Sequence, residues 1–253
     1  MEMSTAADAV NDTGSFTGAR SRPKPAGRVR KILLYGSLAL AVILLLSHFA
    51  WNASGSNEWE LSRDEDGVKV WTLKTPGSNL LKVKAATRVK SSMAGMVKLL
   101  EDLESCVDAE CYDARVIEPI DTLPGRYAAY IRFKYDVPGF RTQDFVLFQE
   151  HYQDPDSKRL EINIIAAPGR IARDECCARV THLHNSWLLT PLKNGELDIE
   201  FVQDTDIVGM PYFLVNLALT LGTHEIMRGM QALMDMDKYR NAPAGIVQEL
   251  AAN

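Results

Sequence analysis

The 253-residue sequence lacks the short signatures of the common enzyme classes. It contains no G-x-S-x-G nucleophile motif, no H-E-x-x-H zinc motif, no P-loop and no glycine-rich dinucleotide-binding pattern. These absences argue against the hydrolases, metalloproteases and nucleotide-binding enzymes that such motifs identify. A nucleophile built from a cysteine and a histidine that are distant in the chain stays open, because spatial neighbours are invisible in a sequence.

Cysteine is also scarce, with four residues: Cys106, Cys111, Cys176 and Cys177. An even number in an exported domain permits disulfides. Cys106 and Cys111 are close together at the end of an expected helix and could form one. A bond between the adjacent Cys176 and Cys177 would be strained, so we expect these two to pair elsewhere or stay free. The spacing is a poor zinc pattern, and we expect neither a metal nor another cofactor.

Charge is absent from residues 32–51, which contain no Asp, Glu, Lys or Arg. Twenty residues at a helical rise of about 1.5 Å span about 30 Å, the thickness of the hydrocarbon layer. Tyr35 and Trp51 lie near the two ends, where aromatic rings favour the membrane interface. We therefore predict one transmembrane helix over residues 32–51. A cleaved signal peptide stays open, although the run exceeds the usual apolar length of about 7–15 residues.

The segments on either side of this run differ in charge. Residues 1–31 are rich in small and polar residues, which predicts a disordered tail, and six basic residues but no acidic ones lie between residues 20 and 31. The positive-inside rule then leaves the N-terminus in the cytoplasm and the following domain outside it, in the periplasm if the protein is bacterial. Residues 52–58 are expected to be a polar linker.

The rest of the chain is acidic. The whole chain carries a net charge of −5 and residues 1–31 carry +3, so the remainder carries −8. This charge argues against nucleic acid as a partner. It also argues against non-specific adhesion to anionic lipid surfaces.

Hydrophobic periodicity beyond residue 58 predicts an α+β domain. A hairpin-like pair (residues 59–89) precedes a helix at residues 91–103, about six further strands between residues 111 and 205, and a long apolar helix at residues 211–236. A run of antiparallel strands covered by one helix favours a helix-grip fold, a curved sheet around the last helix. We expect this domain to cover residues 59–238 and to be followed by a tail at residues 239–253.

Three segments of the domain, in order, resemble the START (steroidogenic acute regulatory protein-related lipid transfer) family. Residues 59–71 (W-x-L-x4-DGVKVW) resemble its first strand, residues 186–195 its late hairpin, and residues 204–216 (DTDIVGMPYFLVN) the entry to its last helix. The resemblance covers roughly residues 58–238. It implies a tunnel that holds one lipid, often a sterol or a phospholipid, without catalysis. The family often has an Arg-Asp pair before a central strand, where this chain has Gln143 and Asp144, so we expect a rebuilt polar end of the cavity.

Several residues are candidates for contact with a lipid. Arg132 could hold a head group if a carboxylate such as Asp144 lies nearby, but a solvated charge is the simpler interpretation, because an unpaired buried charge is costly. Arg179 could be a cavity group or an ordinary ion-pair partner. The apolar residues that open the last helix would line the tunnel mouth as well as the core: Met210, Phe213, Leu214 and Leu217.

The last helix could act as a lid. Gly209 and Pro211 precede it as a flexible link and a rigid start, while Gly222 and Gly229 would let it lie close to the sheet or to a ligand.

Two other function classes stay open: a helix-grip enzyme acting on a hydrophobic small molecule, and a protein-interaction module with a filled core. His182 and His184 could begin a metal site, but a hydrogen-bonded or exposed pair is the simpler interpretation.

Overall fold

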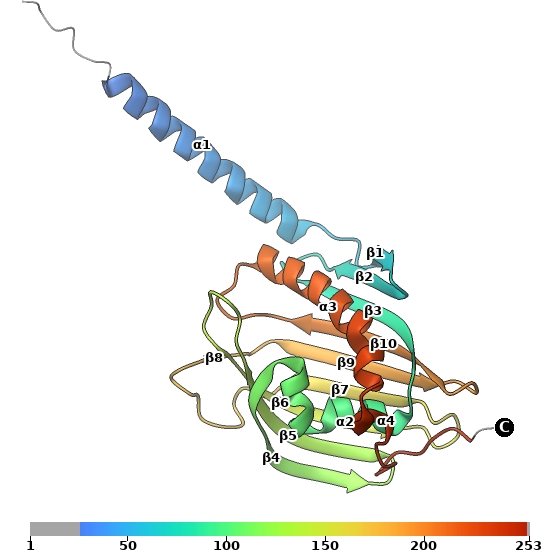
Figure 1. The fold of residues 1–253 in the computed structure, drawn as a ribbon. Coiled ribbons are helices and arrows are strands. Elements are labelled where there is room, and N and C mark those ends of the chain that lie inside the picture. Colours follow the sequence, from blue (N-terminus) through green and yellow to red (C-terminus); the bar gives the residue numbers. More distant parts are fainter. Residues whose placement is uncertain (1–25, 252–253) are drawn as a thin grey trace, which may run out of the picture. The chain divides into compact units, whose positions relative to one another are not determined.

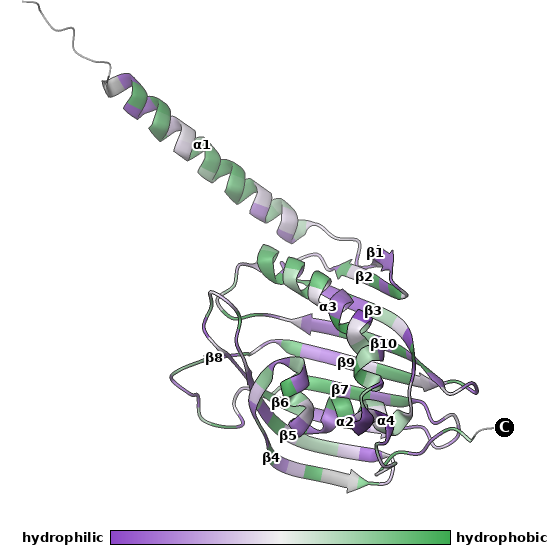
Figure 2. Cartoon of the chain, viewed as in Figure 1, coloured by the Kyte–Doolittle hydropathy of each residue, from purple (hydrophilic) through white to green (hydrophobic). Residues whose placement is uncertain are grey.

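The computed structural model describes residues 26–251. The chain divides into two compact units, and the boundary in the sequence falls between His48 and Phe49. Helix α1 (Ala26–Ala53) contains one stretch, Arg28–Ala53, that is long and apolar enough to cross a membrane. In Figure 2 most residues of α1 have the colour of hydrophobic residues. The helix begins six residues before the predicted span, so residues 26–31 are helical rather than disordered. Residues 1–25 of the predicted disordered tail lie outside the described residues.

The second unit is built on one ten-stranded sheet (Figure 1). The strands follow the order β1-β2-β3-β10-β9-β7-β6-β5-β4, and the short β8 pairs in parallel with β6. All other neighbouring strands are antiparallel. Their bounds are β1 (Trp59–Glu65), β2 (Val68–Lys74), β3 (Leu81–Lys90), β4 (Cys111–Leu123), β5 (Arg126–Tyr135), β6 (Gln143–Gln153), β7 (Leu160–Ala166), β8 (Ala178–Arg179), β9 (Leu183–Pro191) and β10 (Glu196–Thr205).

Helices cover one face of this sheet. They are α2 (Met93–Glu101), the 3-10 helix η1 (Leu103–Ala109), α3 (Tyr212–Met234) and α4 (Asp237–Arg240). The Ser92 hydroxyl caps α2 by accepting a hydrogen bond from the Gly95 amide, as expected of an N-cap serine. Helix α3 packs mainly on β3 and β2, the two strands next to the sheet's β1 edge. This arrangement confirms the predicted helix-grip fold.

The C-terminal segment belongs to the domain, so the predicted tail at residues 239–253 is wrong as far as residue 251. Tyr239 and Val247 are buried in the main apolar cluster. The Glu249 carboxylate accepts hydrogen bonds from the backbone amides of Met93 and Ala94, at 3.0 and 2.9 Å. These contacts join the end of the chain to the start of α2, where free amides and the helix dipole favour an anion.

Three helical glycines have different surroundings. A Cβ atom on Gly95 would lie 2.7 Å from the main-chain oxygen of Tyr239, so α2 and α4 approach closely only because this residue has no side chain. A Cβ atom on Gly222 or Gly229 would meet nothing within 4 Å. The predicted close approach of α3 to the sheet at these two glycines is therefore wrong.

Both cysteine pairs form disulfides. Cys106 and Cys111, which could pair on their spacing, are bonded to each other. Cys176 and Cys177 are bonded to each other, so the prediction that they pair elsewhere or stay free is wrong. The loop turns tightly at Asp174, whose carboxylate accepts from the Cys176 amide and whose main-chain oxygen accepts from the Cys177 amide. This local turn, which sequence spacing does not reveal, brings the two sulfur atoms together.

Candidate functional site

Strand pairing shows which side chains face the helices. One row of paired residues crosses the sheet from β10 to β5 through Gln203, Asn185, Ile164, Gln149 and Ala129. The two ends of this row touch helices, because the Gln203 amide donates to the Thr223 hydroxyl of α3 and the Gln149 amide to a main-chain oxygen of α2. Side chains alternate along a strand. The helix side therefore carries the odd-numbered residues of β3, β5, β6, β9 and β10 and the even-numbered residues of β7, which we name the inner face.

Part of the inner face remains accessible although it points toward the helices. The buried apolar residues form two clusters, one around Trp187 and Phe201 and the other around Ile131 and Phe145. Ile164 packs against both clusters and is itself only half-buried. The half-buried inner-face residues of β5, β7 and β9 are Tyr127, Phe133, Tyr135, Ile164, Ala166, Asn185 and Pro191. They form a largely apolar surface that the helices leave partly uncovered, which is what contact with a hydrophobic ligand requires.

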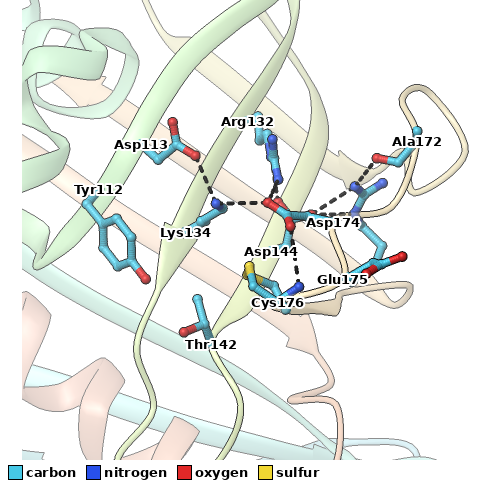
Figure 3. Close-up of polar contacts among 12 residues, drawn as sticks. Tyr112, Asp113, Arg132, Lys134, Thr142, Asp144, Ala172, Asp174, Glu175 and Cys176 are labelled. Atoms are coloured by element: carbon cyan, nitrogen blue, oxygen red, sulfur yellow. Dashed lines mark hydrogen bonds and ion pairs between the residues drawn. A yellow bond between two sulfur atoms is a disulfide. The ribbon is translucent and has the colours of Figure 1, made fainter.

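A buried ionic network lies on the opposite, outer face (Figure 3). Arg132 on β5 and Arg179 on β8 both bind the carboxylate of Asp144 on β6, through Nε–Oδ distances of 2.7 and 2.9 Å. All three residues are at most 7% exposed. Arg179 also donates to three main-chain oxygens of the loop between β7 and β8. One carboxylate thus neutralises one of two buried guanidinium groups and is hydrogen-bonded to both.

The network extends toward the surface through Asp174 and Lys134. Asp174 accepts from Lys134 at 3.1 Å and from Arg132 at 3.2 Å, and Lys134 also contacts Asp113 at 3.0 Å. The hydrogen bond from Lys134 is the largest effect that holds the pKa of the Asp174 carboxyl below its usual value. The hydrogen bond to Asp144 is the largest effect that raises the pKa of Arg132. Both shifts favour the charged forms of Asp174 and Arg132.

The network bears on two predictions: the solvated state of Arg132, and the contact of Arg132, Asp144 and Arg179 with a lipid. Arg132 is buried and paired with Asp144, so its interpretation as a solvated strand charge is wrong. The even number of Arg132 on β5 and of Asp144 on β6 places both side chains on the outer face, and Arg179 joins them there. The structure thus brings together the three predicted polar contacts, but on the face away from the helices and with their charges already paired.

Gln143, which stands where the family often has an arginine, is hydrogen-bonded to the main chain. Gln143 lies on the inner face and is fully buried. Its amide nitrogen donates to the main-chain oxygens of Arg141 and Val208, and its amide oxygen accepts from the Val208 amide at 3.0 Å. Gln143 therefore ties β6 to the segment before α3, in which Gly209 has a positive φ of 87°.

The predicted apolar residues at the start of α3 are mostly exposed. Phe213 is 59% exposed, Leu217 54% and Leu214 37%, and Met210 is half-buried. The residues of this turn that face the sheet are instead Val215 and Asn216, both buried. The helical repeat predicted the helix correctly. Which side of the helix faces the sheet depends on packing.

A buried pair under α2 was missed from the sequence. His151 Nδ1 on β6 contacts Glu101 Oε1 at the end of α2, and the His151 side chain is fully buried. Burial raises the pKa of the Glu101 carboxyl, and the hydrogen bond from His151 opposes this effect without cancelling it. The alternation of β6 places His151 beside Gln149 and Gln153, but a single sequence does not show that a carboxylate lies above them.

Of the two predicted histidines, His184 is exposed and His182 is hydrogen-bonded. His182 Nε2 lies 2.6 Å from Asp204 Oδ1, as expected of a hydrogen-bonded histidine. Burial tends to raise the pKa of Asp204, but hydrogen bonds from His182 and Lys82 outweigh burial and lower it. Within residues 26–251, one set of three potential metal ligands lies close together, namely Asp174, Cys176 and Cys177. The two sulfur atoms are bonded to each other and Asp174 is held by two cations, so this set offers no open ligands.

Comparisons with known proteins agree with this architecture. No protein-family model matches the chain. An uncharacterized protein of Pseudomonas aeruginosa is 25% identical over 182 residues, which are 70% of this chain and 87% of that protein.

Solved structures match the fold over most of the chain. A STAR-related lipid transfer protein of Xanthomonas axonopodis is 19% identical with a TM-score of 0.57, over 69% of this chain and 98% of that one. The lipid transfer and protein localization domain of human StarD13 is 16% identical with a TM-score of 0.58, over 83% and 98%. Human STARD10 is 15% identical with a TM-score of 0.61, over 74% and 77%. These likenesses confirm the predicted resemblance at the level of the fold: the chain has the helix-grip fold of the STAR-related lipid transfer domains.

Proposed function

We propose that this protein binds a lipid on the inner face of its sheet and transfers or presents it without chemical change. The observation that carries the proposal is the partly accessible apolar surface around Phe133, Ile164 and Ala166, which faces α2 and α3. Its START-type fold supports the proposal, since the similar solved structures include named lipid transfer proteins. Burying one acyl CH₂ group is worth about 0.8 kcal/mol. A bilayer offers a similar gain, so exchange between protein and membrane is close to neutral and reversible.

We also propose that α1 is an uncleaved membrane anchor, with the N-terminus in the cytoplasm and the domain on the other side. The charge-free run within Arg28–Ala53 and the basic residues before it support this arrangement. The anchor would keep the carrier beside one membrane. Extraction with alkaline carbonate tests the anchor. Protease added to spheroplasts should digest the domain, and a domain protected from that protease would contradict the orientation.

The full-length protein, reconstituted in donor vesicles, tests lipid transfer directly. We expect it to carry co-purified lipid and to accelerate the movement of fluorescent lipid into acceptor vesicles. A protein that carries no lipid and does not accelerate transfer would contradict the proposal.

A pair of variants separates binding inside the domain from a general effect of α3. Gly222 follows Leu219 by three residues on α3, and its missing side chain leaves open space. Gly222→Leu should fill that space and lower the amount of bound lipid. Ala232→Leu adds similar volume on the exposed side of the same helix and should leave binding unchanged. Equal effects of the two substitutions would show that the lipid does not lie beside Gly222.

A further inference from the structure

The inner face has no charged partner for an anionic head group. On β3, β5, β6, β7, β9 and β10, no inner-face position is Lys, Arg, Asp or Glu. The ionisable imidazole of this face, His151, is fully buried; its Nδ1 contacts Glu101, and its Nε2 has no hydrogen-bond partner within residues 26–251. On α3 the Lys, Arg, Asp and Glu residues are Glu225 and Arg228, which are exposed and paired with each other. The α3 imidazole of His224 is buried, and neither of its ring nitrogens is hydrogen-bonded within residues 26–251. A phosphate or carboxylate placed on this surface would lose its water without gaining a cation, and that is strongly unfavourable.

Most neutral polar groups of the inner face are already used. Gln203 donates a hydrogen bond to Thr223, and Gln149 donates one to the main chain of α2. Gln143 donates to the main-chain oxygens of Arg141 and Val208. Gln153 donates to the main-chain oxygens of Lys158 and Gln248. A ligand would therefore have to displace structural hydrogen bonds to reach these four amides.

Asn185 differs from these four amides, because one end of its side chain is unused. Its Oδ1 accepts from the Asp204 amide at 3.3 Å and from the Thr205 hydroxyl at 3.0 Å. A main-chain amide can only donate, so this contact fixes which end of the Asn185 side chain is oxygen and leaves Nδ2 as a donor. Within residues 26–251, no residue accepts a hydrogen bond from Asn185 Nδ2. Asn185 is half-buried in the middle of the sheet, opposite Ile164 on β7.

We propose that the bound lipid is uncharged, that its polar group is a hydroxyl or a carbonyl, and that Asn185 Nδ2 donates a hydrogen bond to that oxygen. The inference rests on the proposed function and specifies its ligand class. On β9 and β7 the inner-face neighbours of Asn185 are the apolar Leu183, Trp187 and Ile164. On β10 its neighbours are polar but already bonded, Gln203 to Thr223 and Thr205 to Asn185 itself. One donor in such surroundings satisfies one neutral oxygen, and it cannot replace the several charge-assisted bonds that a phosphate needs.

The test compares four labelled probes on the full-length protein in detergent at pH 8: cholesterol, cholest-5-ene, oleate and dioleoylphosphatidylglycerol. Cholest-5-ene is cholesterol without its hydroxyl group. We expect the protein to bind cholesterol at least about tenfold more tightly than either anionic probe, because no cation offsets the lost hydration of an anion. This comparison needs no substitution, so it holds even if a variant folds poorly.

Asn185→Leu then tests the donor, with similar side-chain volume and no amide. We expect the affinity for cholesterol to fall about three- to tenfold, as for one lost hydrogen bond, and the affinity for cholest-5-ene to stay unchanged. Ser186→Ala is the control, since Ser186 is the next residue on β9 and lies on the outer face. Anionic probes that bind as tightly as cholesterol would overturn the inference and leave lipid binding intact. An equal loss for both sterol probes in Asn185→Leu would overturn the role of Asn185. If none of the four probes binds, the proposed function itself is wrong.

Discussion

Replacing the shared carboxylate of the ionic network should strongly destabilise the domain. Asp144→Asn keeps the side-chain volume but removes the charge that Arg132 and Arg179 share, and it turns an NH₂ group toward one guanidinium. Both guanidinium groups lie at most 7% exposed. Breaking a buried ion pair from one side costs about 3–5 kcal/mol. In a domain of this size, 1 kcal/mol corresponds to about 2–4 °C, so the melting temperature should fall by about 6–20 °C.

Thermal unfolding of the full-length protein in detergent, followed by tryptophan fluorescence, measures this change. Asp198→Asn is the matched control, because Asp198 forms a two-point ion pair with Arg88 in which both side chains are about half exposed. Exposed pairs contribute little, so the control should barely move the transition. Equal shifts for Asp144→Asn and Asp198→Asn would refute the argument that burial of the network determines its effect.

Three further predictions address packing, motion and pH. Gly95→Ala should destabilise the domain by about 1–3 kcal/mol, because its Cβ would lie 2.7 Å from a main-chain oxygen of α4; Gly229→Ala, which meets open space, should be neutral or stabilising in the same thermal assay. Asn216 on α3 accepts a hydrogen bond from the Leu81 amide at 2.9 Å, so Leu81→Cys with Asn216→Cys, made without the native cysteines, should form a disulfide that pins α3 and slows vesicle-to-vesicle lipid exchange. Equal exchange by the oxidised and reduced forms would show that α3 does not act as a lid. The carboxyl of Asp204 has a pKa held below 3.8 in the folded protein, so its contribution to stability is present above that pH and is lost as the pH falls through the folded pKa. The urea midpoint should therefore drop between pH 6 and pH 3, and Asp204→Asn should show a smaller drop; an unchanged pH dependence would contradict this assignment.

Local patterns predicted most of the elements. Strand alternation and turn residues predicted the hairpin before α2 and the strands after it, since alternation reflects one buried face. The predicted α2 and α3 agree with the structure to within about two residues at each end. The short α4 and the segment that ends near Glu249 were not predicted, because their stability comes from α2 and β6 rather than from a periodic pattern of their own.

The candidate site shows where sequence reasoning stops. Arg132, Asp144 and Arg179 were chosen as candidate lipid contacts, and a pair of Arg132 with Asp144 was one of two open interpretations, because a buried cation requires a carboxylate nearby. Their side of the sheet depends on the register of β5, β6 and β8, and a shift of one residue would turn each side chain to the other face. Asn185 was not chosen, since an asparagine on a strand stands out only when its neighbours leave one of its donors unused.

The sequence by itself determined that a charge-free helix precedes an acidic α+β domain, because hydrophobicity, charge and alternation are local properties of the chain. It also determined that the last helix must be largely apolar on one side. Only the tertiary structure decided which side of α3 contacts the sheet and which face of the sheet carries the ionic network. It also decided that the Nδ2 donor of Asn185 is left unused. Those features depend on strand register and on contacts between residues far apart in the chain, such as Leu81 with Asn216, and no local pattern encodes such contacts.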